Sequence, residues 1–152
     1  MTTESPLFAS VLVPTDFSDA SLHALALGLR LVRPGGQITL LHVGVVPHLI
    51  ASEYGFAGAS GPLFAQLSAE VNKEQLSKLQ QLAEDHLPAG ISRTLLVREG
   101  YAPDEIVAEV KANAHDLVVM GTLGRTGLQR ALLGSVTERV VRTCTVPVIC
   151  TH

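Results

Sequence analysis

Residues 115–141 read HDLVVMGTLGRTGLQRALLGSVTERVV, and this stretch decides the fold. Its first part, His115 to Met120, is short, apolar and β-branched, as expected for a strand buried on both faces. Its last part places Val136, Val140 and Val141 at helical spacing. The stretch therefore predicts a strand, a glycine-containing loop and a helix, in that order.

The loop between this strand and this helix contains Gly121, Gly124 and Gly134, the last followed by Ser135. Glycine lacks a Cβ, so the backbone can approach an anion closely. The start of a helix presents unpaired N–H groups and the positive end of its dipole. Anions bind at such positions. The loop therefore predicts a phosphate site, although ordinary turn glycines in a chain with 13 of them are the alternative.

The rest of the chain alternates between predicted strands and helices. Proline, glycine and serine mark the ends of several elements, and Ser18 is the expected N-cap of the first helix. A loop from Gly44 to about Pro62 is long enough to be functional or mobile. We expect strands over residues 8–14, 37–43, 94–97, 115–120 and 146–150, and helices over 18–33, 63–87, from about 100 past 110, and 134–143.

Alternating strands and helices predict an α/β fold with an open, doubly wound sheet of five parallel strands and helices on both faces. Ligands of such sheets bind at the carboxyl ends of the strands, where the strand order reverses. In the order 3-2-1-4-5 the reversal lies between strands one and four, next to Asp16 and the glycine loop. In the order 2-1-3-4-5 it would lie away from the glycines. The motif therefore favours 3-2-1-4-5.

Length and composition indicate one soluble domain, residues 1–152. Hydrophobic residues make up 47% of the chain and charged residues 16%, as a sheet covered on both faces requires. The net charge of −3 comes with no basic block, which disfavours nucleic-acid binding. The span between Pro34 and Glu53 contains no Asp, Glu, Lys or Arg, but Gly, Pro and His residues interrupt it, which disfavours a membrane helix. The N-terminus lacks signal-peptide features, so we expect a cytoplasmic protein.

Side-chain chemistry narrows the function further. Cys144 and Cys150 are separated by an extended segment of roughly 18 Å, too far for a disulfide. The six histidines show no metal-ligand spacing, and we predict neither a metal site nor catalytic residues. The first strand is followed by Thr-Asp-Phe-Ser instead of a dinucleotide fingerprint, and Gly134-Ser135 lacks a Walker lysine.

A triphosphate would then rely on loop N–H groups and Arg125, with Mg²⁺ or Mn²⁺ held mainly by phosphate oxygens and water. No carboxylate beside the loop is an evident base for water, so any hydrolysis should be slow. Asp16 is expected to accept hydrogen bonds from ribose hydroxyls, or else to cap the first helix. Ser135 is expected to contact phosphate, to cap the last helix, or to do both.

The sequence resembles the universal stress protein family over nearly its whole length. The resemblance is carried by residues 11–18 (VLVPTDFS), 40–43 (LLHV), 100–103 (GYAP) and 116–137, including the spacing of Gly121, Gly124, Gly134 and Ser135. The ATP-binding branch of that family implies that Asp16 contacts ribose, that Val43 lies against adenine and that the glycine loop surrounds the phosphates. It also implies a homodimer through the last strand. The expected nucleotide-binding residues are Pro14, Thr15, Asp16, Val43, Met120, Gly121, Gly124, Arg125, Gly134, Ser135 and Val136.

We therefore predict a cytoplasmic, ATP-binding regulatory protein of the universal stress type, acting in stress response or signalling. A slow ATPase or phosphotransfer enzyme is the first alternative. A protein-interaction module that binds no nucleotide is the second.

Overall fold

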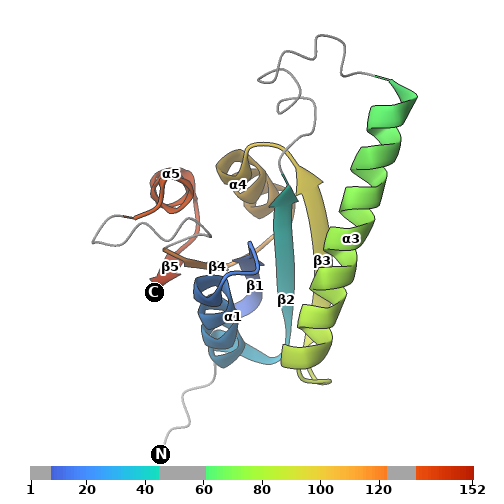
Figure 1. Ribbon diagram of the computed structural model, residues 1–152. Helices are drawn as coiled ribbons and strands as arrows, with labels where there is room; N and C mark the ends of the chain where they lie inside the picture. The colour runs from blue at the N-terminus through green and yellow to red at the C-terminus, as the bar shows by residue number, and fades with distance from the viewer. Residues whose placement is uncertain (1–7, 45–60, 123–132) are drawn as a thin grey trace, which may run out of the picture.

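The computed structural model describes residues 8–44, 61–122 and 133–152, which form a five-stranded sheet covered by helices (Figure 1). All strand pairs are parallel, and their order is β3-β2-β1-β4-β5, as predicted. The elements are β1 (Phe8–Pro14), α1 (Asp19–Leu31), β2 (Val32–Gly44), α3 (Pro62–His86), β3 (Ser92–Glu99), α4 (Ala102–Ala112), β4 (Leu117–Gly121), α5 (Ser135–Thr143) and β5 (Val148–Thr151).

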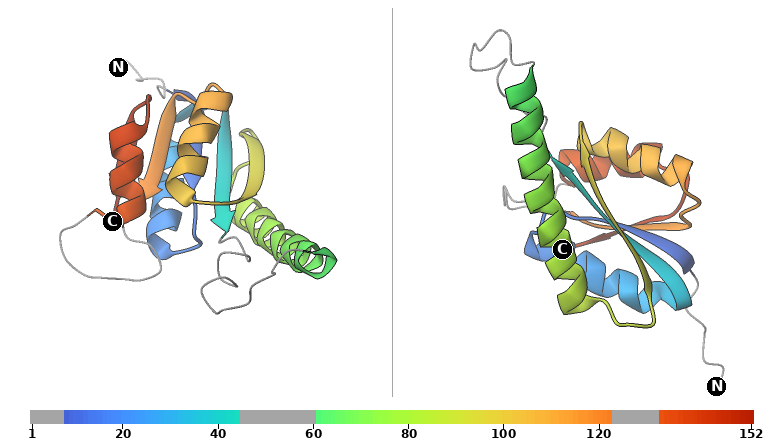
Figure 2. Two further views of the ribbon diagram at one scale, coloured as in Figure 1. Left: turned by 90° about the horizontal axis from the view of Figure 1, so that it is seen from above. Right: turned by 90° about the vertical axis from the view of Figure 1, so that its right-hand side faces the viewer.

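Two hydrophobic cores lie on opposite faces of the sheet. Along β1, Val11 and Val13 point into the core shared with α1 and α3, whereas Leu12 points into the core shared with α4 and α5. Figure 2 shows the same division, with α1 and α3 on one face and α4 and α5 on the other. Both faces are covered, which explains why the central strands are apolar at successive positions. The predicted doubly wound arrangement is confirmed.

The start of β2 differs from the prediction. The first helix ends at Leu31 instead of about residue 33, and β2 begins at Val32 instead of Gln37. Phe8 pairs with Val32 and Ser10 pairs with Gln37, so the register shifts where Pro34-Gly35-Gly36 is inserted. Gly35 has a φ of 71°, a left-handed conformation that glycine adopts without strain. The Pro-Gly-Gly segment is therefore an irregularity inside the strand, where we had expected the turn before it.

The boundaries of β4 and β5 also differ. The fourth strand begins at Leu117 instead of His115, because Asp116 turns its carboxylate to β1 and accepts hydrogen bonds from the N–H groups of Ala9 (2.8 Å) and Ser10 (3.0 Å). The fifth strand runs from Val148 to Thr151 instead of 146–150. It starts after Pro147, which has no N–H to donate to a ladder. Cys144 and Cys150 are free thiols packed against the α4–α5 core.

Helix α3 buries its apolar face along only part of its length. Leu79 and Ala83, in its second half, are fully buried against the sheet. Leu63, Leu67 and Val71, which continue the helical spacing of apolar residues in the first half, are 65%, 45% and 45% exposed. The first half of α3 extends past the end of the sheet in Figure 1, and it reaches β3 only at the last residue of that strand, where the side chains of Ser68 and Asn72 hydrogen bond to Glu99.

Three predictions made from the sequence fall partly or wholly outside the described residues. The loop expected between Gly44 and Pro62 falls on residues 45–60, since Gly44 is the last residue of β2 and Pro62 the first of α3. Gly124 and Arg125 also lie outside the description. Within the ranges that are described, no helix has both the length and the apolar character to cross a membrane.

Candidate functional site

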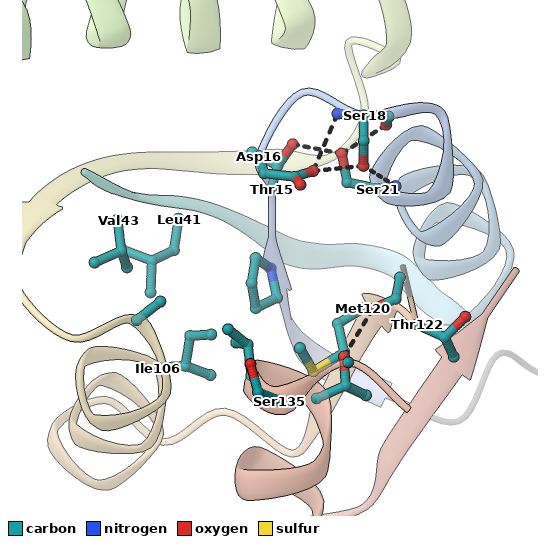
Figure 3. A pocket seen from close by; sticks show the side chains of 16 residues that line it. Thr15, Asp16, Ser18, Ser21, Leu41, Val43, Ile106, Met120, Thr122 and Ser135 are labelled. Carbon is teal, nitrogen blue, oxygen red and sulfur yellow. Dashed lines mark hydrogen bonds between the residues drawn. The ribbon is translucent and has the colours of Figure 1, made fainter. Parts of the chain in front are cut away.

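A pocket of about 250 Å³ lies at the carboxyl ends of β1 and β4, where the strand order reverses (Figure 3). Nine of the eleven predicted site residues line it, and the other two, Gly124 and Arg125, are outside the described ranges. The nine are Pro14, Thr15, Asp16, Val43, Met120, Gly121, Gly134, Ser135 and Val136. Residues more than 100 positions apart in the sequence thus meet in one cavity.

The turn between β1 and α1 fixes the position of the Asp16 carboxylate. Ser18 is the N-cap of α1, as predicted, and its hydroxyl accepts a hydrogen bond from the backbone N–H of Ser21. Asp16 Oδ1 in turn accepts hydrogen bonds from the backbone N–H of Ser18 (3.0 Å) and from its hydroxyl (2.5 Å). Capping is therefore performed by Ser18, and Asp16 supports the cap while lining the pocket.

Neighbouring residues make this turn rigid. The backbone N–H of Phe17 donates to Thr15 Oγ1 (3.0 Å), which is also hydrogen bonded to Ser21 Oγ (2.9 Å). Phe17 has a φ of 65°, which is uncommon for a bulky residue. Its ring lies 4.8 Å from that of His42, and His42 Nδ1 donates to the Thr15 carbonyl oxygen (2.9 Å). These contacts hold Phe17 in a strained conformation, and strain of this kind clusters at functional sites.

On the other side of the pocket, α5 begins at Ser135 with Gly134 as its N-cap. No side chain caps this helix, so the sequence-based alternative that Ser135 is the N-cap is wrong. The first N–H groups of a helix have no intrahelical partner. Residues of this first turn, Gly134 through Thr137, line the pocket. The cavity is therefore bordered by the positive end of a helix dipole.

The two ends of the glycine loop are tied to the sheet. Thr137 Oγ1 donates to the Gly121 carbonyl oxygen (3.0 Å), and the N–H of Gly134 donates to the Thr122 carbonyl oxygen (3.0 Å). Thr122 itself donates its backbone N–H to Thr151 of β5 (2.7 Å). The start of α5 is thus held next to the end of β4.

Gly121 has a packing role that its sequence motif did not reveal. A Cβ at this position would lie 2.8 Å from the Ala20 Cβ and 2.9 Å from the Ala20 carbonyl carbon. Helix α1 therefore packs directly on the Gly121 backbone. The need for glycine here comes at least partly from this helix contact, which is independent of any bound phosphate.

We expect Gly121→Ala to lower the free energy of unfolding by about 1–3 kcal/mol, the usual cost of forcing a methyl group into a packed site. Urea unfolding followed by circular dichroism measures it. Gly90→Ala is the matched control, because a Cβ there meets no atom within 4 Å. Equal stability of the two variants would show that α1 shifts without strain.

The remaining wall of the pocket is apolar. Leu41, Ile106 and Met120 are almost fully buried, and Val43 packs beside them (Figure 3). Ile106 and Ala102 belong to the first half of α4, a helix that we predicted from the sequence without assigning it to the site. The pocket residues missed by the sequence analysis are Ser18, Ser21, Leu41, Ala102, Ile106, Thr122 and Thr137.

Charge is sparse in this cavity. Among the described residues that line it, Asp16 is the one charged side chain, and none is Lys or Arg. Arg139 lies outside it and bridges α5 to α4 through Asp104 (3.3 Å) and the ring of Tyr101 (5.5 Å from the centroid). Among the described lining residues, the groups that could bind an anion are therefore backbone N–H groups and the positive end of the α5 dipole.

Comparison with known proteins identifies the family of this chain. The model of the "Universal stress protein family" matches residues 8–152. Universal stress protein MJ0531 of Methanocaldococcus jannaschii is 33% identical over 144 residues, which cover 94% of this chain and 81% of that protein.

Solved structures agree with this match. MJ0577 is a universal stress protein of the same organism, and its structure superimposes on this one with a TM-score of 0.79 at 26% sequence identity. The match covers 93% of this chain and 94% of the MJ0577 chain. A universal stress protein from Archaeoglobus fulgidus, solved in complex with dAMP, has the same fold at 18% identity (TM-score 0.55; 97% and 99% covered). The chain belongs to the universal stress protein family.

Proposed function

We propose that this universal stress protein family member binds ATP in the pocket between β1 and β4 and acts as a regulatory protein through its nucleotide-dependent state. One observation carries the proposal: a fixed carboxylate, an apolar wall and an uncapped helix start border the same cavity. These are the groups that a ribose, a base and a phosphate chain require. The relative that binds dAMP supports an adenine nucleotide as the ligand class.

Each part of the nucleotide has a matching surface. The base lies against Val43, Ile106 and Met120, because an aromatic ring gains from apolar burial. Ribose hydroxyls donate to the carboxylate of Asp16, which hydrogen bonds from Ser18 hold at the edge of the pocket. The phosphates lie at the first turn of α5, where Ser135 supplies a backbone N–H and a hydroxyl. In Figure 3 Asp16 and Ser135 lie on opposite sides of the pocket.

A divalent cation would enter with the phosphates. Among the described residues, no three His, Cys, Asp or Glu side chains gather into a possible metal site. Mg²⁺ commonly keeps several waters and binds mainly through substrate phosphates. Mg²⁺ or Mn²⁺ would offset the phosphate charge that the described lining leaves uncompensated.

Replacing Ser135 with proline tests the helix-start site without removing the helix. Proline is favoured at the first helical position because it lacks only an N–H that the helix does not use. Gly134, with φ −58° and ψ 153°, already has the extended conformation that precedes proline. Because hydrogen bonds to charged groups contribute about 1.5–3 kcal/mol, we expect ATP affinity to fall at least tenfold in calorimetric titration.

Two controls separate the possible causes of a loss of ATP affinity in the Ser135→Pro protein. Ser135→Ala keeps the N–H and removes only the hydroxyl, so it should weaken ATP binding less than proline does. Adenosine lacks phosphate and should bind all three proteins equally. If Ser135→Pro binds ATP as tightly as the wild type, the phosphates do not contact the start of α5.

The proposal extends to assembly and location. Strand β5 is at the edge of the sheet, and an uncovered apolar edge favours pairing with another chain. We propose a homodimer through the segment from Val146 to Thr151, in a cytoplasmic protein of the stress response. Light scattering should give twice the mass of one chain at micromolar concentration; a single-chain mass at all concentrations contradicts the dimer.

A further inference from the structure

Phe17 follows Asp16 directly and, among the described residues, is the one residue other than glycine with a positive φ, 65°. The left-handed region is sterically unfavourable for an aromatic residue, whereas glycine adopts it freely. Such a conformation persists only where surrounding contacts hold it. The turn that carries the Asp16 carboxylate to the nucleotide pocket therefore depends on contacts made by the residues next to it.

His42, on β2, makes those contacts from the other face of the sheet. The next residue, Val43, lines the pocket, and side chains alternate between the two faces along a strand. The His42 ring therefore lies on the α1 side, 4.8 Å from the Phe17 ring at an interplanar angle of 37°. Its Nδ1 donates to the Thr15 carbonyl oxygen (2.9 Å). One side chain thus contacts the residues before and after Asp16.

The Thr15 carbonyl group requires a partner of this kind. Thr15 is the residue after β1 and is 7% exposed, and buried backbone groups are almost always hydrogen bonded. Its N–H donates to the Leu41 carbonyl oxygen (2.9 Å), so two consecutive residues of β2 hold both backbone groups of Thr15. The Thr15 carbonyl and the Asp16 N–H belong to one planar peptide. Fixing that carbonyl therefore fixes the direction in which the chain enters Asp16.

We propose that His42, through its Nδ1 hydrogen bond to Thr15, is a positioning residue that sets the preference of the nucleotide site for ribose hydroxyls. This role rests on the proposed function, in which those hydroxyls donate to Asp16. Hydrogen bonds weaken steeply when donor and acceptor are misaligned, so a turn that is no longer held loses the hydroxyl contacts first. The apolar wall and the start of α5 belong to other elements and still bind base and phosphates. His42 therefore controls selectivity more than overall affinity.

The test compares ATP with 2′,3′-dideoxyATP, which lacks both ribose hydroxyls, by calorimetric titration in the presence of Mg²⁺. We expect the wild type to prefer ATP at least about tenfold, the factor that one hydrogen bond to a charged group contributes. His42→Phe removes the Nδ1 donor and keeps a ring against Phe17, whereas His42→Leu removes both. In each variant the affinity for ATP should fall about fivefold, as for the loss of one typical hydrogen bond. The affinity for dideoxyATP should stay the same.

His42→Asn tests rescue, because its side-chain amide nitrogen can donate to the Thr15 carbonyl from nearly the position of Nδ1. It should restore the preference for ATP. His86→Phe, at the exposed end of α3, is the control for the substitution itself and should change neither affinity. A variant that is only less stable would bind both nucleotides less well, and the ratio of the two affinities would stay at the wild-type value.

The outcomes separate this role from nucleotide binding itself. If the wild type binds no ATP, the proposed function is wrong and the positioning role fails with it. If the wild type binds both nucleotides equally, or if His42→Phe and His42→Leu keep its preference, ATP binding stands and the positioning role is overturned. Loss of the preference in His42→Asn together with the other two variants would also overturn it, because the hydrogen bond would then not be the cause.

Discussion

Saturating Mg-ATP should raise the melting temperature of the nucleotide-free protein by about 5–11 °C. A ligand that binds only the native state stabilises it by about 2.7 kcal/mol at 100 times its dissociation constant. For a domain of this size each kcal/mol corresponds to roughly 2–4 °C. Differential scanning calorimetry measures the shift directly. No shift at millimolar ATP would contradict nucleotide binding and favour the interaction-module alternative.

The Asp16→Ala protein should show less than about half of this shift at the same ATP concentration. Loss of a hydrogen bond to a charged group, about 1.5–3 kcal/mol, removes most of the stabilisation that the ligand supplies. Asp16→Ala also removes the support of the Ser18 cap, so the shift and not the absolute melting temperature is compared. Asp19→Ala is the control, since Asp19 is a carboxylate in the first turn of α1 outside the pocket. An undiminished shift in Asp16→Ala would mean that ribose is bound elsewhere.

The strand order was predictable because two sequence features, each at the end of a predicted strand, were expected in the same ligand site. Asp16 follows the first strand, and Gly121 follows the fourth. Only one of the two common topologies brings the ends of these strands together at the reversal point. The periodicity of the buried strands supplied the rest, since apolar residues at successive positions require helices on both faces.

The packing reason for Gly121 could not be predicted from its neighbours in sequence. The residue that it contacts, Ala20, is about 100 positions away, and its identity depends on how α1 crosses β4. The apolar wall formed by Ile106 was missed for a related reason. A helical period shows which side of α4 is buried, but it does not show that one end of that side borders a cavity.

The exposed first half of α3 also shows that helical periodicity does not reveal which residues are covered in the fold. Leu63, Leu67 and Val71 continue the apolar spacing of the buried half, so periodicity alone assigns them to the core. Whether a helix face is covered depends on the length of the sheet beneath it, which the local sequence does not specify. The predicted starts of β2 and β4 were wrong for a similar reason, because both depend on contacts with a distant part of the chain. Val32 pairs with Phe8 of β1, and the Asp116 side chain accepts a hydrogen bond from Ala9 of β1.

Replacing Glu109 with alanine should lower the free energy of unfolding by about 3 kcal/mol. Removing one partner of a buried charge pair typically costs 3–5 kcal/mol. The lower end applies here, because the Arg98 side chain is 30% exposed and lies 3.6 Å from a second carboxylate, Glu105. The Nε2–H of His115 and the amide of Asn113 would also lose their acceptor. The expected fall in melting temperature is roughly 6–12 °C.

Glu138→Ala is the matched control for this change, because Glu138 forms an exposed ion pair with Arg142 on α5 (2.8 Å), and such pairs contribute at most about 1 kcal/mol. Glu109→Gln separates charge from hydrogen bonding: the amide oxygen can still accept from His115, but the charge opposite Arg98 is gone. An intermediate loss is expected for it in urea unfolding. If Glu109→Ala unfolds at the same urea concentration as Glu138→Ala, the buried carboxylate contributes no more than a surface one, and α4 is held on the sheet by its buried apolar residues, Ile106 and Val110 among them.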